Sequence, residues 1–384
     1  MRTILNPLRI AINHTRFSLA GGIERHVYRL VEHLLSRGHE VHCFVRRWEP
    51  YPHPRLHFHA VPVLPFGEGV KALSFAYASA FLLRRQRFDI IHGFTKTFRQ
   101  DVYTDGAGSL DDYLAALRGW RGPLKLRPLA NLALRHLERR RFQARPAPRV
   151  LAMSRLARGQ ILARYRLPER AVEVLYGGVD AEEFRPATGS TEREAVRCAL
   201  ETPPEAVTVL FAGSDYQRKG LDIAIEALSR LRRPDVVLWV LGRDRRRAAY
   251  ERLARQKGIE ARFAGLERRP QEFFRAADVF VFPSRYDIFG NAGLEAMASG
   301  LAAVISASAG VSEIVRDGVD SLILREPEDA GELTSHLETL LDPETRRRLG
   351  KNARETALRH RLEAHFERVV EVYREVVDGP AGVA

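Results

Sequence analysis

The chain alternates short apolar runs with longer stretches in which apolar residues recur every three or four positions. Residues 8–14 (LRIAINH) have the pattern of a strand, and residues 22–38 have helical spacing that ends at Gly38. Five more apolar runs predict strands in this first part: EVHCFV, LHFHAVPV, FDIIHGF, DVYTD and RVLAMS. Strands that alternate with helices in this way predict a parallel sheet with helices on both faces.

The same alternation starts again after Pro203 and Pro204. Six apolar runs predict the strands of this second part: AVTVLFAGS, DVVLWVLG, IEARFAG, VFVFPS, LAAVISA and SLILRE. A helical pattern precedes each of the last two strands, and the chain is almost entirely helical from Pro327 onward. The predicted fold class is therefore α/β, with two Rossmann-like doubly wound domains that face a cleft and are joined near residues 174–186.

Length and composition agree with two globular domains. The chain has 384 residues, and its two cysteines, Cys43 and Cys198, exclude a disulfide framework and a Cys-rich metal site. The first residues lack the apolar segment of a signal peptide, and no run of about 18 apolar residues predicts a membrane-spanning helix. We expect a cytoplasmic protein, or one on the cytoplasmic face of the inner membrane.

The basic charge of the chain has two explanations. The formal net charge is +13, and only six of the basic residues are lysines. A basic surface suits polyanionic partners, but an arginine-rich chain also uses arginine on ordinary solvated surfaces. Residues 118–149 contain ten Lys or Arg, one acid and interleaved Leu and Trp. This segment predicts either an element that binds an anionic membrane surface or a solvated helix packed on its own domain.

In doubly wound folds, ligands bind at the loops that follow the strands. Gly21 and Gly22 follow the first strand and open a helix, which suits an anion, although a plain strand–helix turn explains them as well. In GSDYQRKG, Gly213 and Ser214 follow a strand, and the adjacent Arg218 and Lys219 precede a helix. These two cations would neutralise a diphosphate, or would simply form a solvated basic turn.

The segment SRYDIFGNAGLEAMASG places two acids around a glycine-bearing turn. Asp287 precedes the turn Phe289-Gly290-Asn291-Ala292-Gly293, and Glu295 follows it. The turn leads into a helix, whose first N–H groups suit a phosphate. Carboxylates would repel a phosphate but can accept hydrogen bonds from sugar hydroxyls. Either acid alone is ordinary at its place, and the combination indicates a nucleotide-sugar site.

Three further residues or pairs in the first part are less informative. Asp105 ends a strand and could belong to a plain Asp-Gly turn. His92 is interpreted as a histidine with satisfied hydrogen bonds in the core or the cleft. Asp111 and Asp112 are adjacent on a predicted helix and so do not share a face. The sequence shows no convincing metal constellation, and no metal site is predicted.

Three segments together resemble the GT-B, family 4 glycosyltransferases: GSDYQRKGLDIAIEAL, DIFGNAGLEAMASG and GGVDAEEFRP. The acidic pair Asp287 and Glu295 has the E-x7-E spacing of that family, and GGIERH resembles its amino-terminal glycine loop. Within the family the chain most resembles the glucosyltransferases of the lipopolysaccharide core. The resemblance implies an acceptor-binding domain over residues 1–175, to which a helix of residues 364–384 returns, and a nucleotide-sugar-binding domain over residues 176–363.

The resemblance also implies roles for the residues already named. Arg218 and Lys219 would bind the donor diphosphate, Glu295 the ribose, and Asp287 the transferred sugar. Asp105 would lie near the reacting carbon. The other expected donor contacts are Gly21, Gly22, Gly213, Ser214, Phe289, Gly290, Asn291 and Ala292. The family implies a retaining reaction without a metal or other cofactor, with UDP-glucose as donor and a lipid-linked saccharide as acceptor.

The sequence departs from the family pattern at two informative positions and leaves other functions open. Asp287 stands where a Glu is usual, so its carboxylate is one methylene shorter, and Gly177 stands where an Asn is usual. One alternative is a GT-B enzyme that is not a transferase, such as a nucleotide-sugar epimerase. The other is a basic nucleic-acid-binding protein, for which no recognised binding motif is present. We therefore expect no nucleic-acid partner.

Overall fold

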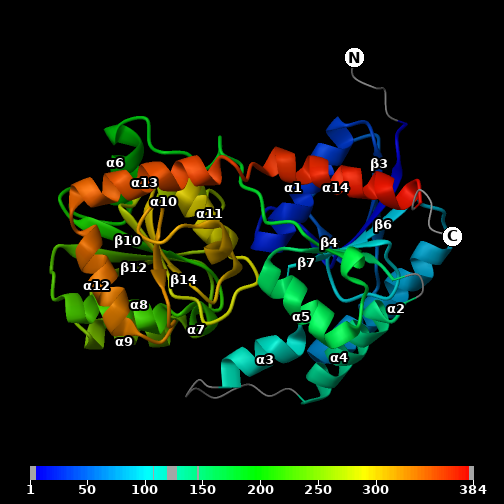
Figure 1. Cartoon of the computed structure of the whole chain (residues 1–384), viewed down its shortest axis with the longest axis horizontal. Helices are drawn as coiled ribbons and strands as arrows, with labels where there is room; N and C mark the ends of the chain where they lie inside the picture. The colour runs from blue at the N-terminus through cyan, green and yellow to red at the C-terminus, as the bar shows by residue number, and fades with distance from the viewer. Residues whose placement is uncertain (1–5, 107, 119–127, 145–146, 380–384) are drawn as a thin grey trace. The chain divides into compact units, whose positions relative to one another are not determined.

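The computed structural model describes residues 6–106, 108–118, 128–144 and 147–379. Contacts within the chain divide it into two units. Unit 1 comprises Met1–Leu175 and His365–Ala384, and unit 2 comprises Tyr176–Ala364. Each unit is built around one parallel sheet (Figure 1).

The sheet of unit 1 has seven strands in the order β5-β3-β1-β6-β7-β8-β9, and all of its neighbouring strands are parallel. Its strands are β1 (Arg9–Asn13), β3 (Glu40–Val45), β5 (Leu56–Ala60), β6 (Ile90–Gly93), β7 (Val102–Asp105), β8 (Arg149–Ala152) and β9 (Val172–Val174). A separate pair joins β2 (Arg16–Phe17) to β4 (Arg47–Trp48). Most of these strands are apolar on both faces because helices cover both faces.

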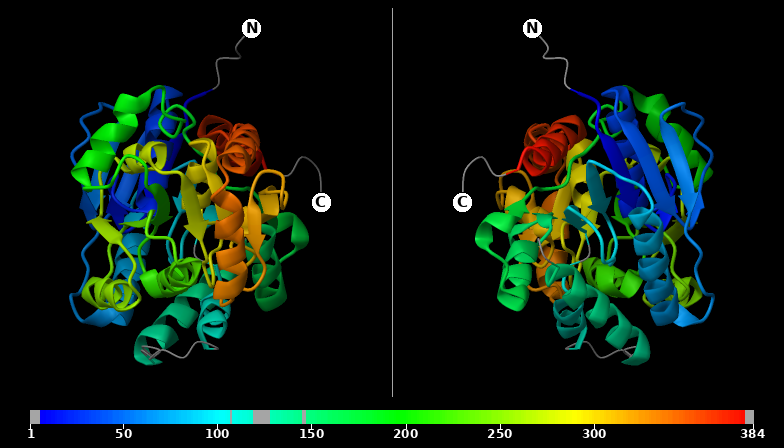
Figure 2. Two further views of the ribbon diagram at one scale, coloured as in Figure 1. Left: turned by 90° about the vertical axis from the view of Figure 1, so that its left-hand side faces the viewer. Right: turned by 90° about the vertical axis from the view of Figure 1, so that its right-hand side faces the viewer.

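Most helices of unit 1 connect these parallel strands. They are α1 (Gly22–Ser36), α2 (Gly67–Arg84), α3 (Leu110–Arg118), α4 (Pro128–Phe142), α5 (Arg155–Tyr165), the 3-10 helix η1 (Glu169–Ala171) and, from His365 onward, α14 (Leu362–Val377). On one face, Phe75 and Leu83 of α2 pack against Ala11 and Phe44 of the sheet. Helix α4 lies beside α2, as both views of Figure 2 show.

The sheet of unit 2 has six parallel strands in the order β12-β11-β10-β13-β14-β15. They are β10 (Val207–Ala212), β11 (Val236–Leu241), β12 (Ala261–Gly265), β13 (Val279–Phe282), β14 (Ala302–Ser306) and β15 (Leu322–Leu324). The helices are α6 (Ser190–Ala199), α7 (Tyr216–Lys219), α8 (Leu221–Leu231), α9 (Arg247–Gln256), α10 (Pro270–Ala276), α11 (Asn291–Ala298), η2 (Gly310–Ile314), α12 (Ala330–Leu340) and α13 (Pro343–Ala357).

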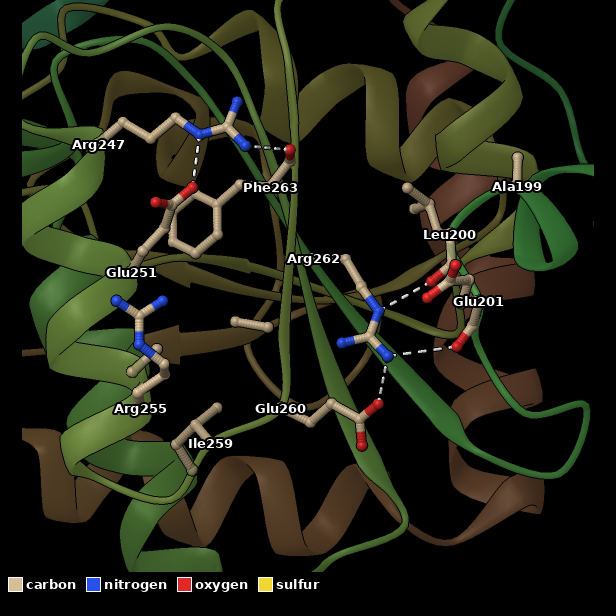
Figure 3. Close-up of a pocket in the computed structure, with 12 residues that line it drawn as sticks. Ala199, Leu200, Glu201, Arg247, Glu251, Arg255, Ile259, Glu260, Arg262 and Phe263 are labelled. Carbon is tan, nitrogen blue, oxygen red and sulfur yellow. Dashed lines mark hydrogen bonds and ion pairs between the residues drawn. The ribbon is translucent and has the colours of Figure 1, made fainter.

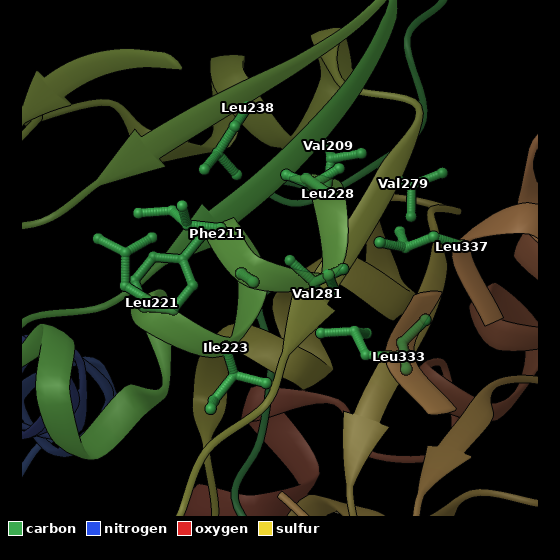
Figure 4. Close-up of a cluster of buried hydrophobic side chains, with 14 of the residues drawn as sticks. Val209, Phe211, Leu221, Ile223, Leu228, Leu238, Val279, Val281, Leu333 and Leu337 are labelled. Carbon is green, nitrogen blue, oxygen red and sulfur yellow. The ribbon is translucent and has the colours of Figure 1, made fainter. Parts of the chain in front are cut away.

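The core of unit 2 explains why its strands are continuous apolar runs. Phe211 and Val281 face α8 and α12 and meet Leu333 of α12 in one buried cluster (Figure 4). Residues of the opposite face pack on α10, where Trp239 lies edge-on to Phe273. Helices α8, α9 and α12 thus cover one face and α6 and α10 the other, as Figure 1 shows.

Both sheets have the Rossmann strand order. Numbered within each unit, the first six strands follow the order 3-2-1-4-5-6, so the connections reverse direction between the first and fourth strands. These strands are β1 and β6 in unit 1 and β10 and β13 in unit 2. The predicted α/β class with two Rossmann-like parts is confirmed. The rule for such sheets predicts ligand sites beyond the carboxyl ends of these central strands.

The helix expected before SLILRE is a short 3-10 helix, η2. Within the described part of the chain, no helix combines the length and the apolar character that crossing a membrane requires.

Candidate donor site

The two loops that follow β10 and β13 meet at the switch point of unit 2. The backbone N–H of Arg285 donates to the carbonyl of Arg218 over 2.9 Å. The guanidinium of Arg218 donates in return to the carbonyl of Tyr286, also over 2.9 Å. The fold therefore brings the basic pair and the acidic segment together, although Lys219 and Asp287 are 68 positions apart in the chain.

Asp287 accepts hydrogen bonds from both cations through one oxygen. Arg218 Nη1 lies 2.8 Å from Asp287 Oδ2, and Lys219 Nζ donates to the same oxygen. Lys219 is buried, and its Nζ lies 4.4 Å from the centre of the Phe282 ring. Arg218 Nε also lies 3.2 Å from the more exposed Asp215, so two positive and two negative charges meet at this site.

The protonation states follow from this arrangement. Burial by itself would raise the pKa of Asp287, but Lys219 and Arg218 lower it to about 2. Burial lowers the pKa of Lys219 to about 8, and the attraction of Asp287 opposes that effect only in part. At neutral pH all three groups are charged, and the lysine is the one that titrates closest to physiological pH.

Glycines make the close approaches in this site possible. A side chain at Gly213 would place its Cβ 3.2 Å from Lys219 Cγ, so Gly213 leaves the path of the lysine open. Gly290 has a φ of 93°, in the left-handed region, and a Cβ there would lie 2.6 Å from the Phe282 ring. Gly290 is the N-cap of α11, and the helix begins at Asn291.

The start of α11 supplies the anion-binding geometry that the turn predicts. The first N–H groups of a helix have no carbonyl partner within that helix and carry its partial positive charge. Those of Asn291 and Ala292 belong to this turn. The carbonyl of Phe289 accepts from the N–H of Val311 over 2.7 Å, which fixes the loop before the helix. Glu295 lies one turn further along α11 and is partly exposed.

Ser214 also lies at this edge of the sheet, where its hydroxyl accepts a hydrogen bond from the N–H of Arg243 over 3.2 Å. The structure thus places the unit 2 residues predicted for the donor site around the ends of β10 and β13.

Arg285 was not anticipated from the sequence, yet it ties the two loops together. Its buried guanidinium binds Asp222 over 2.9 and 2.7 Å and Glu328 over 2.5 and 3.1 Å, and it donates to the carbonyl of Gln217. It is a positioning residue, since it holds the turn that carries Arg218 and Lys219. The sequence feature that could have indicated this role is the position of the arginine directly after the buried run VFVFPS.

Gly177 has a packing reason for its departure from the family pattern. A Cβ at this position would lie 2.6 Å from the Phe289 ring and 2.8 Å from Asn291 Oδ1. Phe289 is itself buried. An asparagine at position 177 would therefore force the buried Phe289 ring and the Asn291 side chain to shift.

The structure places Asp105 in the interior of unit 1. It is the last residue of β7 and is 1% exposed. Its Oδ1 accepts from the Tyr103 hydroxyl over 3.2 Å and from the N–H of Gly108 over 3.1 Å, and its buried Oδ2 has no partner among the described residues. Burial raises the pKa of Asp105 despite the nearby charges of Arg141 and Lys96. The bond to Gly108 is that of an Asp turn.

A buried polar cluster beside Asp105 comes from the predicted basic segment. Glu138 of α4 is 1% exposed, binds Lys96 and accepts from the Tyr165 hydroxyl over 2.5 Å. Arg141 is equally buried, and its guanidinium lies 3.6 Å from the centre of the Tyr103 ring. Part of the segment 118–149 is thus internal, which charge counting could not reveal. Its residues 119–127 and 145–146 lie outside the described residues.

The glycine loop of unit 1 lies at the start of α1. Gly21 is the N-cap with a φ of 105°, and nothing lies within 4 Å of a Cβ built on Gly22. The carboxylate of Glu24 lies close to Gly21, and burial raises its pKa. An anion at this helix start would have to displace that carboxylate.

Two other interpretations of unit 1 are resolved. His92 is fully buried, with Nδ1 2.6 Å from the Tyr373 hydroxyl and Nε2 2.8 Å from Thr104 Oγ1, so it is a core histidine with satisfied hydrogen bonds. Asp111 and Asp112 both pair with arginines, and one of these, Arg164, contacts both acids, with its Nη1 3.8 Å from Asp111. Arg135 Nε lies 2.6 Å from Asp111, and Arg164 binds Asp112 over 2.6 and 2.5 Å.

A separate pocket of unit 2 contains none of the predicted site residues (Figure 3). Its polar side chains largely satisfy one another. Arg262 binds Glu260 and the carbonyls of Leu200 and Glu201, while Arg247 binds Glu251. We assign no function to it.

Fold and site define the class of protein. Two doubly wound units with a basic pair and an acidic pair at the end of the second sheet are features of the GT-B glycosyltransferases. Residues 20–107 match the family model described as Glycosyltransferase Family 4, and residues 192–356 match the one described as Glycosyl transferases group 1. The chain belongs to the family 4 glycosyltransferases of the GT-B fold.

Two curated relatives have functions in lipopolysaccharide synthesis. The chain is 25% identical over 367 residues to the lipopolysaccharide glucosyltransferase WaaG of Escherichia coli (strain K12), covering 94% of this chain and 96% of that protein. It is 35% identical over 172 residues to the lipopolysaccharide core biosynthesis glycosyltransferase LpsE of Rhizobium meliloti (strain 1021). This match covers 44% of the chain and 50% of the relative, so the chain spans about half the length of LpsE.

Solved structures agree with the fold. The crystal structure of WaaG, described as a glycosyltransferase involved in lipopolysaccharide biosynthesis, has a TM-score of 0.85 at 22% identity and covers 95% of this chain and 99% of that one. Anabaena Alr3699/HepE in complex with UDP-glucose has a TM-score of 0.75 at 17% identity, with 95% and 99% coverage.

Proposed function

We propose that the protein is a retaining glycosyltransferase that moves glucose from UDP-glucose to a saccharide of the lipopolysaccharide core or a similar lipid-linked acceptor. The observation that carries the proposal is the meeting of Arg218, Lys219 and Asp287 at the switch point of unit 2, beside the start of α11. The names of the relatives WaaG and LpsE support the choice of sugar and acceptor.

In the proposed reaction, the bond between the anomeric carbon and the β-phosphate oxygen breaks, and a bond from an acceptor hydroxyl oxygen to the same carbon forms. The acceptor attacks from the face that the leaving group vacates, which retains the configuration. Its proton passes to the departing diphosphate. The sugar is oxocarbenium-like at the transition state, and negative charge builds on the diphosphate.

Arg218 and Lys219 stabilise that developing charge, together with the N–H groups at the start of α11. Fixed cations and N–H groups act most strongly where charge appears in the transition state. The diphosphate charge is balanced by side chains and backbone, so the proposed reaction needs no metal or other cofactor.

Asp287 would have one role in the free protein and another when the donor is bound. In the free protein it is the counter-ion of Arg218 and Lys219. A bound diphosphate supplies negative charge to the same cations, so the Asp287 carboxylate becomes available to accept hydrogen bonds from the hexose hydroxyls. Glu295 holds the ribose, and Gly213, Ser214, Phe289 and Gly290 complete the donor contacts in unit 2.

Gly21, Gly22 and Asp105 are the unit 1 residues that would take part in the reaction. The two glycines would let a diphosphate approach the start of α1 after Glu24 moves. Asp105 would act near the acceptor hydroxyl, which requires its buried carboxylate to become accessible when substrates bind.

A surface of unit 1 supports binding to an anionic membrane on the cytoplasmic side, where a lipid-linked acceptor would be found. Five large apolar residues of α2 and α4 are at least 41% exposed: Val70, Tyr77, Phe81, Leu129 and Leu132. We call these five the α2–α4 surface. Arg85 lies over the Phe81 ring at 4.2 Å, and Arg139 and Arg140 are exposed on α4. Apolar residues flanked by arginines suit the surface of an anionic bilayer.

The test is a thermal-shift panel of nucleotide sugars followed by a transfer assay with lipopolysaccharide that lacks its outer sugars. We expect UDP-glucose to raise the melting midpoint most and glucose to appear on the acceptor. Interconversion of sugar epimers without transfer would instead identify an epimerase. Binding to nucleic acid at physiological salt, without any response to nucleotide sugars, would support the nucleic-acid alternative.

A further inference from the structure

Four side chains of the kinds that can bind metals lie on one face of the unit 1 sheet. Glu40 and His42 are two residues apart on β3, and His57 and His59 are two residues apart on β5. Residues two apart in a strand share a face, and the parallel register pairs His42 with His57. We call these four residues the His–Glu cluster.

Three ligand atoms of the His–Glu cluster converge. Glu40 Oε1 lies 2.7 Å from His42 Nε2 and 3.7 Å from His57 Nε2, and one ligand atom of each residue lies within 4.8 Å of the others. Ligand atoms about 2.0–2.2 Å from one tetrahedral Zn²⁺ lie roughly 3.4 Å from one another. Small side-chain rotations therefore suffice to bring all three onto one ion.

His42 Nε2 has two neighbours that bear on a bound ion. In the free protein it donates a hydrogen bond to Glu40 Oε1 over 2.7 Å, and Arg9 Nε lies 3.4 Å from the same carboxylate oxygen. An ion bound at Nε2 would replace that proton and leave the N–H of the ring on Nδ1, which lies 2.9 Å from His59 Nε2. A histidine that binds a metal commonly donates its other N–H to a neighbour in this way.

The charges around the His–Glu cluster both favour and oppose a cation. The carboxylate of Glu40 lies beside the imidazoles of His42 and His57 and favours a cation. Neutral imidazoles and a carboxylate are the ligand forms that metals require. The guanidinium of Arg9 opposes a cation, and its Nη1 is held by the carbonyl of Arg87 over 2.9 Å.

We propose that Glu40, His42 and His57 bind a divalent transition metal ion of the zinc class, with His59 orienting His42. Imidazole and carboxylate ligands suit zinc better than magnesium or calcium, which prefer oxygen ligands alone. The side chain of His57 is 45% exposed, which leaves a path for the ion and room for a water ligand. The ion would join the edge strand β5 to β3.

The position indicates a structural role. Glu40 is the first residue of β3 and His57 the second of β5, so the cluster lies at the amino-terminal ends of the strands. The predicted ligand residues of both units follow the carboxyl ends of their strands instead. This inference does not rest on the proposed transferase function.

The test uses the full-length protein without a polyhistidine tag, freed of metal by a chelator. We expect calorimetry to show one Zn²⁺ per chain and the melting midpoint to rise by about 5 °C at a 100-fold excess over Kd. Co²⁺ should give the visible absorption of a site with nitrogen ligands, and Mg²⁺ should give neither response.

Variants make the test specific. His57→Ala, at an exposed position, should abolish the stoichiometric binding, whereas His136→Ala, an exposed histidine of α4, should leave it intact. Arg9→Gln should tighten binding at least several-fold, because it removes the opposing charge. Absence of Zn²⁺ binding to the unaltered protein, or equal binding by His57→Ala, would overturn the proposal. Glycosyl transfer measured on the same samples tests the proposed function separately.

Discussion

Lys219 donates a hydrogen bond to Asp287 from inside unit 2, and the two residues stand 68 positions apart in the chain. Lys219 follows β10, and Asp287 follows β13. Because these two strands are neighbours in the sheet, their carboxyl ends bring the residues together. The pair links the basic turn to the acidic segment and is the centre of the candidate donor site.

Lys219→Ala should slow sugar transfer, because the variant lacks a fixed charge beside the leaving group. We expect the loss of transition-state stabilisation to be about 2–4 kcal/mol. Steady-state kinetics with saturating donor measure this effect. Lys257→Ala is the control, since that lysine pairs with Glu226 at an exposed place. Turnover close to normal in a folded Lys219→Ala protein would exclude the proposed role.

The pH dependence of kcat/KM should report the protonation of Lys219. Its pKa is lowered from 10.5 to about 8, so the side chain is a cation below pH 8 and becomes neutral above it. The activity should therefore fall above about pH 8, by up to tenfold per pH unit. Asp287 stays ionised down to about pH 2 and adds no loss near neutral pH. In Lys219→Arg, which stays charged, the alkaline loss should move to higher pH. If the fall in kcat/KM at alkaline pH is the same in Lys219→Arg, a group other than Lys219 causes it.

Asp287→Asn should destabilise the free protein by about 1–3 kcal/mol, because it leaves Arg218 and Lys219 without their buried counter-ion. UDP supplies negative charge to the same cations, so it should raise the melting midpoint of this variant more than that of the unaltered protein. Differential scanning fluorimetry with and without UDP measures both effects. Equal UDP shifts in the two proteins would contradict the exchange of counter-ions.

Glu138→Gln should destabilise the protein by about 3 kcal/mol, because Lys96 then keeps a buried charge without a partner. Chemical denaturation measures the change in the free energy of unfolding. Glu68→Gln is the control, since its ion pair with Lys71 is exposed and should be worth less than 1 kcal/mol. Similar losses in the free energy of unfolding of the two variants would show that the buried pair stabilises the protein no more than the exposed pair does.

Leu129→Glu and Phe81→Glu should each reduce co-sedimentation with anionic vesicles, because they put a negative charge on the α2–α4 surface. Leu266→Glu in unit 2 is the control, since Leu266 is 53% exposed outside that surface. Binding of the unaltered protein should weaken as salt rises. If none of it sediments with the vesicles, or all variants bind alike, the proposed membrane surface is wrong.

The residue types of the donor loops could be predicted from the sequence because short motifs encode them. Gly290 before Asn291 marks a helix start, and the position of each loop after an apolar run marks the functional edge of a sheet. The two Rossmann-like parts could be predicted for the same reason, since the spacing of apolar residues indicates helices and strands directly.

Other features depend on contacts between distant segments. Arg285 and Glu138 look like ordinary charged residues in the sequence, yet both make buried ion pairs across separate elements. The reason for a glycine at position 177 also lies elsewhere in the chain, because a side chain there would clash with the Phe289 ring. No local pattern encodes such pairs.

By itself, the sequence determined the fold class, the family resemblance and the residue types at the donor loops, because these follow from periodicity and short motifs. Only the tertiary structure decided which charges are partners. It joined Asp287 to Arg218 and Lys219 and buried Asp105. It also placed Glu40 and His42 beside His57. The physical reason is that strand order brings distant residues into register, and burial then sets their charge states.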